Sequence, residues 1–405
     1  MRPFDARRVL LGVSGGIASY KSAWLARLIA QAGAEVDVVM TRSATEFVGP
    51  ITFEALTGRP VHTDLFTVGR ALDHIRLARE AHAIVVAPAT ADLMARAAHG
   101  RADDLLAACL LANGDPRAHA PVLFVPAMND RMWSHPQTQR NVDALRAIGY
   151  QLLEPETGML AAGEGVGPGR MPEPETIVAH LGRLLETRSL AGQRVLVTAG
   201  PTREAIDPVR FISNRSSGRM GVAIAAAAWR RGAEVTLVAG PLEVPVPSGV
   251  RHVAIETTDE MRDAVAHEMQ NADALVMAAA PADFRPASAA AAKIKKRSAP
   301  TSIPLAPTPD ILSETRGLRP RRAVIVGFAL ETDDVLAGGR AKLDEKGLDL
   351  IVVNDARERG AGFGTETNRV TFLWPDGRED ALALQPKSDV ADAIVDRVEE
   401  LMRGR

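Results

Sequence analysis

The chain has 405 residues, of which 46% are hydrophobic and 24% are charged. This length exceeds the roughly 100 to 200 residues of one ordinary domain, so we expect two domains with separate cores. The 48 basic and 50 acidic side chains nearly balance, which excludes a strong overall attraction to nucleic acid or to an anionic membrane. A single cysteine, Cys109, excludes an intramolecular disulfide framework.

The beginning of the chain, MRPFDARRVLLGVSGG, lacks the apolar core and cleavage signature of a signal peptide. No apolar run is long enough to span a bilayer. We therefore expect a cytoplasmic protein with no membrane partner.

Short apolar runs alternate with helical patterns along the whole chain. The runs in the first half are RVLLGV, EVDVVM, AIVVAPA and PVLFVPA, and those in the second half are QRVLVTAG, EVTLVAG, ADALVMAAA, RAVIVGFA and LDLIVVND. Such runs predict buried parallel strands, and their alternation with helices predicts a doubly wound α/β sheet. We predict two such domains, residues 1–190 and 191–405, divided within the polar stretch LLETRSLAGQR.

Two segments of the second half predict loops. Segment 241–250 contains three prolines, which a central strand does not tolerate. Segment 281–309 is similar and longer, and loops of that length in a compact domain are usually functional or disordered.

A small-residue loop, GVSGGIASYK, follows the first strand and precedes a helix. Backbone amides and the helix dipole would converge above Ser14, Gly15 and Gly16, and an anionic phosphate suits such a place. The spacing is not the dinucleotide fingerprint, and no acid closes the second strand, which disfavours a nicotinamide cofactor. A tight turn with a purely packing role is the alternative.

Polar residues follow two further strands. APATAD places Thr90, and PAMNDRMW places Asn129 and Met132, at the carboxyl edge of the sheet, where ligands of α/β proteins bind. His74 lies in ALDHIRLARE before a helical pattern and could carry a proton, because imidazole titrates near neutral pH. A capping or surface histidine is the alternative interpretation of His74.

These motifs, in this order, resemble the flavin-containing cysteine decarboxylases. The resemblance is closer still to the decarboxylase half of the bifunctional phosphopantothenoylcysteine decarboxylase and phosphopantothenate-cysteine ligase family, and the second half carries the ligase motifs. It implies a flavodoxin-like domain followed by a Rossmann-like domain. It also implies FMN, with its phosphate near Ser14, Gly15 and Ser43 and its ring by Ala89 and Thr90, His74 as acid or base, and Asn129 and Met132 holding substrate.

Flavin chemistry explains how such a substrate loses carbon dioxide. Oxidation of the cysteinyl thiol to a thioaldehyde supplies an electron sink for the negative charge left behind, and FMN takes the hydride equivalent. The resulting enethiolate must then be reduced and protonated. That last step needs an acid.

The chain departs from the family at this acid. The family uses a cysteine in a mobile flap, whereas the matching stretch here is LAAGEGVGPGRMPEP, with Ala162 at the cysteine position. Alanine has no titratable proton. Cys109 lies at apolar helical spacing and reads as structural, so Glu164 or an ordered water remain candidate substitutes.

The loop FISNRSSGRMG in the second half fits a phosphorylated, carboxylate-bearing substrate. Arg210 can contact an anion with two donors, and Asn214 can donate to an oxygen that becomes negative during acyl transfer. Ser216, Ser217 and Gly218 would open a helix whose amides suit a phosphate. A capping segment on a solvated turn is the alternative.

Charged residues further along suit a nucleotide and a metal. Asp283 ends a buried strand and suits Mg2+, and Lys293 begins the basic run KIKKR, which is short and lacks the aromatic residues expected of a nucleic-acid patch. Asp310 starts a helix, Phe328 could stack on a base, and Lys342 and Lys346 share one helix face. By resemblance the nucleotide is CTP, and the CTP-binding residues are Met277, Ala278, Ala279, Asp283, Lys293, Pro309, Asp310, Ile311, Leu312, Phe328, Lys342 and Lys346.

The resemblance predicts two linked reactions of coenzyme A synthesis. 4'-Phosphopantothenate would be activated by CTP as an acyl cytidylate and joined to cysteine, and the product would then be decarboxylated. The family also implies a homo-oligomer with trimeric decarboxylase and dimeric ligase contacts. The alternatives are a working ligase with an impaired decarboxylase, an NAD(P)-dependent oxidoreductase, and a nucleotide-sensing or nucleic-acid-binding protein.

Overall fold

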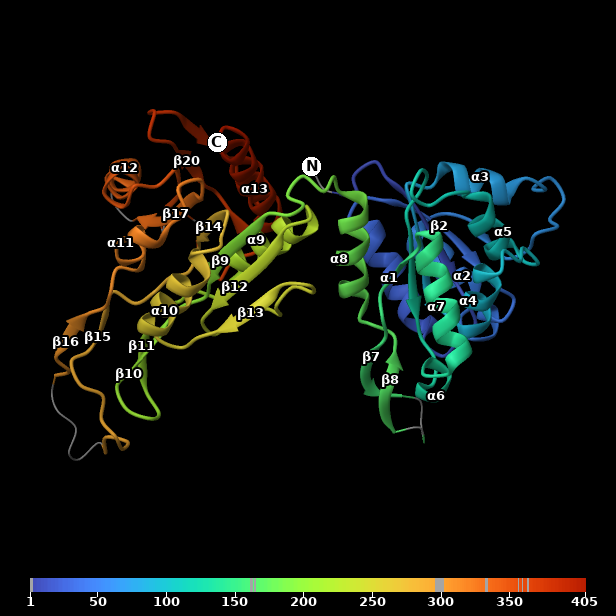
Figure 1. Ribbon diagram of the computed structural model, residues 1–405, viewed down its shortest axis with the longest axis horizontal. Helices are drawn as coiled ribbons and strands as arrows, with labels where there is room; N and C mark the ends of the chain where they lie inside the picture. The colour runs from blue at the N-terminus through green and yellow to red at the C-terminus, as the bar shows by residue number, and fades with distance from the viewer. Residues whose placement is uncertain are drawn as a thin grey trace. The chain divides into compact units, whose positions relative to one another are not determined.

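The computed structural model describes residues 3–160, 163, 165–295, 302–331, 334–355, 357–358, 360–362 and 364–405. The chain divides into two compact units, Met1–Thr187 and Arg188–Arg405 (Figure 1). Within the described residues, no helix is both long and apolar enough to cross a membrane.

The first unit consists of one sheet, one separate hairpin and the helices around them. Its strands are β1 (Arg8–Val13), β2 (Glu35–Met40), β3 (Val61–His62), β4 (Ala83–Ala89), β5 (Val122–Pro126) and β6 (Gln151–Leu152), with the hairpin formed by β7 (Glu156–Met159) and β8 (Val166–Arg170). Its helices are α1 (Ser19–Gln31), α2 (Pro50–Thr57), α3 (Asp73–Glu80), α4 (Ala91–Ala98), α5 (Leu105–Ala112), α6 (Asp130–Trp133), α7 (Pro136–Ile148) and α8 (Pro174–Leu185), with a 3-10 turn at Ala44–Glu46.

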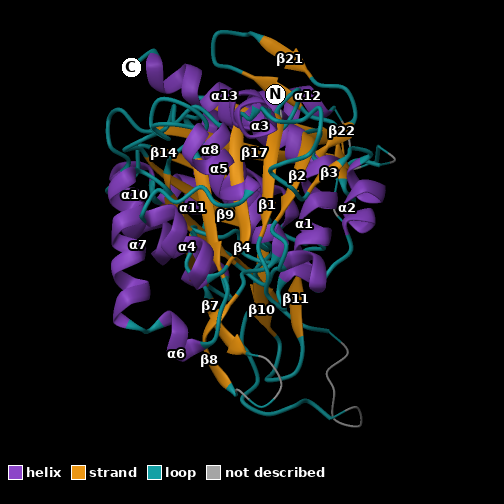
Figure 2. Ribbon diagram, turned by 90° about the vertical axis from the view of Figure 1, so that its right-hand side faces the viewer, coloured by secondary structure: helices purple, strands orange, loops and turns teal. Residues whose placement is uncertain are grey.

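The sheet of the first unit is parallel and has the order β3-β2-β1-β4-β5-β6. The four apolar runs predicted as strands are β1, β2, β4 and β5, and the predicted doubly wound sheet is confirmed. Its two faces are covered by different helices, with Leu25, Phe53 and Ile177 in one core and Leu93 and Leu145 in the other. Figure 2 shows α1 and α2 on one side of the strands and α4 and α7 on the other.

This strand order is that of a Rossmann sheet and differs from the flavodoxin order, in which the strand that follows the crossover is the third in sequence. The direction of winding reverses between β1 and β4. Ligands of doubly wound sheets bind at the carboxyl ends of the strands at such a reversal. The loops after Val13 and Ala89 meet there.

The second unit repeats this plan and extends it. Its strands are β9 (Arg194–Ala199), β10 (Arg203–Ala205), β11 (Phe211–Ser213), β12 (Glu234–Ala239), β13 (Arg251–Ala254), β14 (Ala274–Met277), β15 (Phe284–Pro286), β16 (Leu305–Pro307), β17 (Val324–Glu331), β18 (Leu350–Asp355), β19 (Thr367–Asn368), β20 (Thr371–Leu373), β21 (Glu379–Ala381) and β22 (Gln385–Pro386). Its helices are α9 (Arg219–Arg230), α10 (Thr258–Met269), α11 (Ile311–Glu314), α12 (Val335–Lys346) and α13 (Lys387–Arg403), with a 3-10 turn at Arg316–Leu318.

The main sheet of the second unit has the order β13-β12-β9-β14-β17-β18-β20-β21. The first six strands are parallel, and β20 and β21 are antiparallel additions. The five predicted strands of this half are β9, β12, β14, β17 and β18, so the second doubly wound sheet is confirmed as well. Winding reverses between β9 and β14, and an isolated bridge joins Pro201 to Ala280 just beyond them.

The two predicted loops differ in outcome. Segment 241–250 contains no helix or strand, as predicted. Segment 281–309 instead contains β15 and β16, which pair with each other, and β15 lies against β10 and β11. We call these four short strands the arm, and Figure 1 shows them together beyond one end of the main sheet.

Glycine ends the first helix of each sheet in the same way. Gly33 and Gly232 have φ angles of 107° and 99°, which an L side chain rarely adopts. Each follows a helix and precedes the second strand of its sheet. The repeated phrase A/R-G-A-E-V therefore marks the same helix C-terminus in both units.

Candidate active sites

The loop after β1 is held to the loop after β4 by Ser14. The Ser14 hydroxyl donates to the Pro88 carbonyl oxygen at 2.7 Å and accepts from the Thr90 amide at 3.0 Å. Thr90 in turn caps α4 by accepting from the Leu93 amide at 3.3 Å. The Ser14 side chain is thus buried in bonds that fix the ends of β1 and β4, and Thr90 stands at the rim.

Gly15 and Ser43 are brought together at the same edge. A Cβ on Gly15 would lie 2.3 Å from the Ser43 Cβ and 2.7 Å from the Ser43 carbonyl carbon, so no other residue fits there without a shift. Among the described residues, the Gly15 amide has no hydrogen-bond partner. The close approach of two backbone segments and an unpaired amide form a cradle suited to an anionic group.

Asn129 and Met132 lie beyond the end of β5. Asn129 caps α6 by accepting from the Arg131 amide at 2.9 Å, and the Met132 side chain is half exposed. The hairpin packs on this segment, because the Met128 amide donates to the Gly169 carbonyl at 3.1 Å. The stretch predicted to form the flap runs into the β7–β8 hairpin, and its Ala162 and Glu164 lie outside the described residues.

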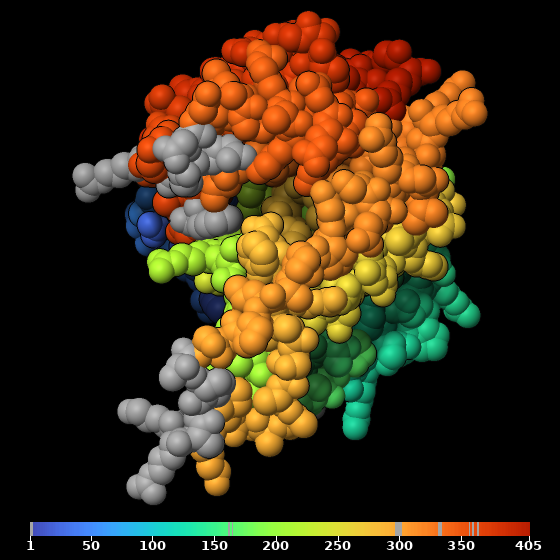
Figure 3. Space-filling model, turned by 90° about the vertical axis from the view of Figure 1, so that its left-hand side faces the viewer, coloured from blue at the N-terminus to red at the C-terminus, as the bar shows by residue number. Residues whose placement is uncertain are grey.

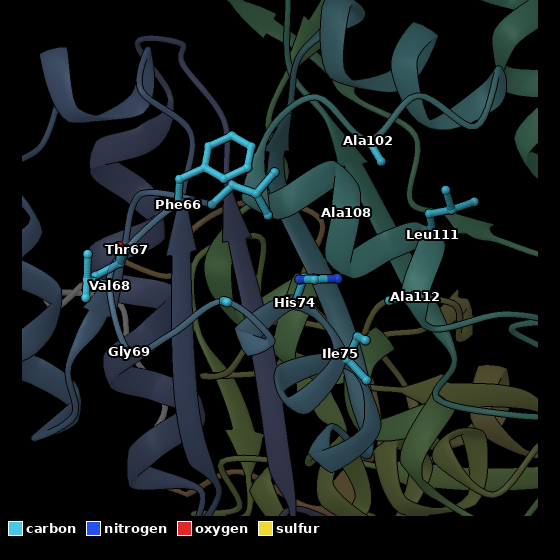
Figure 4. Close-up of a pocket in the computed structure, with 12 residues that line it drawn as sticks. Phe66, Thr67, Val68, Gly69, His74, Ile75, Ala102, Ala108, Leu111 and Ala112 are labelled. Carbon is cyan, nitrogen blue, oxygen red and sulfur yellow. The ribbon is translucent and has the colours of Figure 1, made fainter.

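His74 lies in a different place, in the first turn of α3. It lines a cavity of about 830 Å3, together with segment 65–69 and with residues of α5 and the segment preceding it. Figure 4 shows His74 between the segment that carries Phe66 and the helix that carries Leu111. Within the described part of the chain, Nδ1 of His74 is buried without a hydrogen-bond partner.

The residues predicted for the first site therefore lie in separate places within one chain, with Asn129 and Met132 beyond β5. Ser14, Gly15, Ser43, Ala89 and Thr90 gather at the reversal between β1 and β4. Of all the residues predicted for this site, His74 is the one that lines the apolar cavity.

Cys109 is fully buried on α5, away from solvent. Burial raises the pKa of its thiol to about 12, and the nearby Asp73 and Asp104 carboxylates act in the same direction. Such a thiol does not ionise near neutral pH, in agreement with its interpretation as structural.

The second unit gathers most of its predicted residues in one cavity of about 340 Å3. Figure 3 shows this unit hollowed between orange and gold segments of the chain. The predicted residues in its lining are Asn214, Ser216, Ser217, Gly218, Ala278, Ala279, Asp283, Phe328 and Lys342. They come from the start of α9, the end of β14, β17 and α12, so the fold itself assembles them.

Asn214 and the start of α9 are fixed by backbone contacts. The Asn214 side-chain amide donates to the carbonyl oxygens of Ala280 and Pro281 at 3.2 and 2.9 Å. Gly218 has a φ of 77°, and a Cβ on Gly221 would lie 2.6 Å from the Thr198 carbonyl oxygen. The helix therefore starts close to β9, and its first residues line the cavity.

Arg210 does not line this cavity, and its guanidinium binds Asp207. Oδ2 of Asp207 accepts from Nε of Arg210 at 3.0 Å and from the Ile294 amide at 3.1 Å, and Arg210 also donates to the Ile294 carbonyl at 2.9 Å. The Arg210 guanidinium holds the pKa of the buried Asp207 carboxyl well below its usual range, and backbone donors add to this effect. The exposed Lys293 directly precedes Ile294 in the segment between β15 and β16.

The remaining predicted nucleotide residues lie near the cavity without lining it. Met277 is buried on β14, where its sulfur accepts from the Thr198 hydroxyl at 3.2 Å. Asp310 caps α11, preceded by Pro309 and followed by the buried Ile311 and Leu312, and its carboxylate pairs with Lys346 at 3.3 Å. Lys346 therefore pairs with a carboxylate here, although it lies one helical turn from Lys342.

Several cavity residues were missed from the sequence. Arg219, Asn354, Asn368 and Lys387 line the cavity from four separate elements or their ends. No local motif marks the last three, because only the folding of β18, β19 and α13 brings them beside α9. Among the described residues, no cluster of three or more His, Cys, Asp or Glu side chains could hold a metal, so Asp283 is a single carboxylate.

Comparison with known proteins assigns a family to each unit. The family described as "DNA/pantothenate metabolism flavoprotein C-terminal domain" matches residues 190–402, and the family described as "Flavoprotein" matches residues 2–186. The solved C-terminal domain of a coenzyme A biosynthesis bifunctional protein CoaBC is similar to 54% of this chain and 100% of that domain, with 38% identity and a TM-score of 0.47.

Full-length relatives carry the assignment across both units. The coenzyme A biosynthesis bifunctional protein CoaBC of Mycolicibacterium smegmatis is 48% identical over 98% of this chain and 99% of its own length. The protein of the same name from Vibrio vulnificus is 43% identical over 99% of this chain and 100% of its own length. Identity at this level along the entire chain leaves neither unit unmatched: the chain belongs to the family of coenzyme A biosynthesis bifunctional proteins CoaBC.

Proposed function

We propose that the chain catalyses two consecutive steps of coenzyme A synthesis. Residues 191–405 join 4'-phosphopantothenate to cysteine at the expense of CTP, and residues 1–190 decarboxylate the product. The observation that carries the proposal is the second-unit cavity, which combines a helix N-terminus, an amide, a carboxylate, a lysine and an aromatic ring. Each of these groups suits one part of a nucleotide-activated carboxylate.

The ligase reaction begins when the phosphopantothenate carboxylate attacks the α-phosphorus of CTP. A P–O bond to the carboxylate forms, and the bond to pyrophosphate breaks. The amides at the start of α9 and Lys342 would offset the phosphate charge, and Phe328 would line the cytosine. The cysteine amine then attacks the acyl carbon, loses a proton and expels CMP, while Asn214 lies beside the carbonyl on which negative charge develops.

Mg2+ stays a prediction. Asp283 lines the cavity as a single carboxylate, and Mg2+ is commonly held by one or two carboxylates together with substrate phosphates. The ion would therefore arrive with CTP rather than occupy a site built from protein groups alone.

The residues at the edge of the first sheet fit FMN. The Gly15 and Ser43 cradle suits its phosphate, and Ala89 and Thr90 would lie beside its ring. When bound, FMN supplies a reversible two-electron acceptor for oxidation of the cysteinyl thiol. Membership of a flavoprotein family over residues 2–186 supports this cofactor.

The protein groups of the decarboxylase bind substrate and move protons. Asn129 and Met132 would hold the phosphopantothenoylcysteine, and the hairpin that packs on segment 128–130 would cover it. His74 would take or return a proton, and within the described residues its Nδ1 has no hydrogen-bond partner.

We further propose a homo-oligomer in which a second copy completes each site. His74 lines a different cavity from the one expected for the FMN residues, and Arg210 and Lys293, in segments next to the strands of the arm, do not line the ligase cavity. Phe66 and Val68 beside His74 are 84% and 100% exposed, which is unusual for apolar side chains that stay in water. Trimeric contacts in the first unit, dimeric contacts in the second and a cytoplasmic location stay predictions.

A second candidate function is a working ligase joined to an impaired decarboxylase, because Ala162 stands where the family has the flap cysteine. Without the flap thiol, the enethiol product would accumulate unless another group supplies the proton. Glu164 is the candidate for that group, two residues along the chain. Replacement of Ala162 by Cys would restore a thiol at this position.

One incubation tests both halves. The protein is given phosphopantothenate, cysteine and CTP, and CMP, carbon dioxide and the mass of the thiol are followed. We expect CMP formation only with all three compounds, and carbon dioxide release from an FMN-loaded protein. A product two mass units light would show that proton delivery fails, and an unchanged result with Glu164→Gln would exclude Glu164. Absence of CMP would contradict the ligase assignment.

A further inference from the structure

A buried lysine that was not among the predicted nucleotide residues also lines the ligase cavity. Lys387 opens α13, its residue is 8% exposed, and its Nζ donates to the Gly362 carbonyl oxygen at 2.9 Å. An ammonium group can donate three hydrogen bonds. A carbonyl is a neutral partner, so it does not balance the charge of a buried ammonium.

Arg219 lines the same cavity from the start of α9, near enough to Lys387 to affect its charge. Its Nη1 pairs at 2.7 Å with Glu366, whose side chain is 80% exposed to solvent. Its Nε is buried and has no hydrogen-bond partner within the described residues. Among the described residues, Glu366 is therefore the one carboxylate paired with these two cations, and its side chain is exposed to solvent.

The pKa of Lys387 is lowered by its burial and by this excess of positive charge. Burial lowers the pKa of its amine, the nearby Arg219 guanidinium lowers it further, and Glu366 opposes them. An incoming anion would reverse the effect by favouring the charged ammonium. A negatively charged ligand would therefore stabilise the charged form of Lys387.

Two asparagines that line the same cavity are held in place by hydrogen bonds. Asn354 donates to Oδ1 of Asn368 at 2.8 Å, and this oxygen also accepts from the amides of Arg369 at 3.1 Å and Gly362 at 3.3 Å. The amide nitrogen of Asn368 points to the Met220 sulfur at 3.9 Å, a weak acceptor. The Oδ1 of Asn368 is therefore already saturated by donors, and the cations beside it have no carboxylate partner other than Glu366 among the described residues.

We propose that Lys387 and Arg219 form a phosphate-binding subsite of the ligase cavity, separate from Lys342. The proposal rests on the proposed ligase function, because the phosphate would come from one of its substrates. Two sources share this chemistry: the terminal phosphates of the nucleoside triphosphate and the phosphate monoester of phosphopantothenate. A cytosine base does not suit the subsite, since two cations and amide donors offer it no apolar surface.

Binding without turnover tests the subsite directly. Titration calorimetry measures inorganic triphosphate, CTP, CMP, phosphopantothenate and pantothenate against the wild-type chain and Lys387→Met, which keeps the aliphatic stem. We expect at least about tenfold weaker binding of the ligand whose phosphate occupies the subsite, the usual effect of losing a charge-assisted hydrogen bond. Arg403→Met is the matched control, because it removes an exposed cation from the same helix outside the cavity.

The two sources give different patterns. If the subsite holds terminal phosphates, Lys387→Met weakens CTP and inorganic triphosphate and leaves CMP unchanged. If it holds the phosphopantothenate phosphate, the variant weakens phosphopantothenate and leaves pantothenate unchanged. Unchanged affinity for every phosphate compound in both Lys387→Met and Arg219→Met overturns the proposal.

Two further measurements separate this proposal from loss of fold and from failure of the ligase function. Lys387→Arg keeps a cation and should recover most of the affinity, whereas a structural role for the lysine stem would leave Lys387→Met and wild type equal in phosphate affinity. If circular dichroism shows Lys387→Met unfolded, Arg219→Met decides alone. A wild-type chain that binds phosphate compounds through Lys387 but forms no CMP would refute the ligase function and retain the subsite.

Discussion

The two units share one sheet order and differ in how they use it. In both, the winding reverses between the first and fourth strands of the sheet, β1 and β4 in one unit and β9 and β14 in the other. The second unit surrounds this reversal with side chains from four elements in one cavity. The first unit places its anion cradle at the reversal but leaves His74 in a separate apolar cavity.

The difference shows that a shared edge does not ensure a complete site. Residues that directly follow β1, β4, β9 or β14 reach the reversal because the sheet carries them there. Residues on α3 or near the arm do not reach the reversal, because the chain has already left the main sheet where they lie. In the homo-oligomer proposed above, a second copy of the chain would complete each site. The following variants test each unit separately.

Asn214→Asp should break the second site with the largest effect. The substitution replaces a donor by a carboxylate opposite the carbonyl oxygens of Ala280 and Pro281, which now accept from Asn214. We expect CTP-dependent CMP formation to fall by about 100-fold or more, the usual cost of losing an oxyanion donor. Decarboxylation of phosphopantothenoylcysteine supplied directly should stay at the wild-type rate, and an equal loss there would contradict the separation of the units.

Gly15→Ala should disrupt the first site and leave the second site intact. Its Cβ would lie 2.3 Å from the Ser43 Cβ, so one of the two backbone segments must move and the cradle opens. We expect FMN affinity to fall about tenfold or more, as for a lost charge-assisted contact, measured by flavin fluorescence, with CMP formation unaffected. Gly317→Ala, where no atom lies within 4 Å of the new Cβ, is the matched control.

Acid should weaken the second unit through Asp207. Its pKa is lowered in the folded chain, chiefly by Arg210, so this carboxylate stabilises the fold at pH values above its usual pKa of about 4 and loses that effect as the pH falls below it. Asp207→Asn should therefore unfold at lower urea concentration than wild type at pH 7.

The difference between Asp207→Asn and wild type should shrink as the pH falls through about 4. Asp376→Asn, on an exposed turn between β20 and β21, should match wild type throughout. A constant difference at all pH values would mean that the amide disturbs packing rather than an ionised carboxylate.

Most strands of the two main sheets could be predicted, because each one is marked by a short apolar run in its own stretch of sequence. Apolar runs such as RVLLGV and EVTLVAG each became a buried parallel strand. Asp283 could be selected because it follows the run ADALVMAAA, and Asn214 because it lies in a polar loop that precedes a helix. The short pairing of β15 with β16 escaped prediction, because three-residue strands containing proline carry almost no periodic signal.

What escaped prediction in the second site depends on tertiary structure. Lys387 is separated by 168 residues from Arg219, and nothing near it in sequence indicates a cavity. The binding of Arg210 by Asp207 had a local signal, an acid three residues before the arginine, but an aspartate at this spacing occurs on many turns. A cation whose partner is already present in the folded chain cannot be recognised from residue type alone.

Cys109→Ala should have the smallest effect, and it tests whether the thiol of the first unit takes part in catalysis. The thiol is buried in the helix that borders the His74 cavity, and burial raises its pKa to about 12, so it neither ionises near neutral pH nor reaches solvent. We expect decarboxylation and CMP formation at wild-type rates and a loss of about 1 kcal/mol in the free energy of unfolding, the ordinary cost of a small core truncation. A change in product mass would instead make Cys109 the missing proton donor, and the separate first-unit residues would then have to meet within one chain.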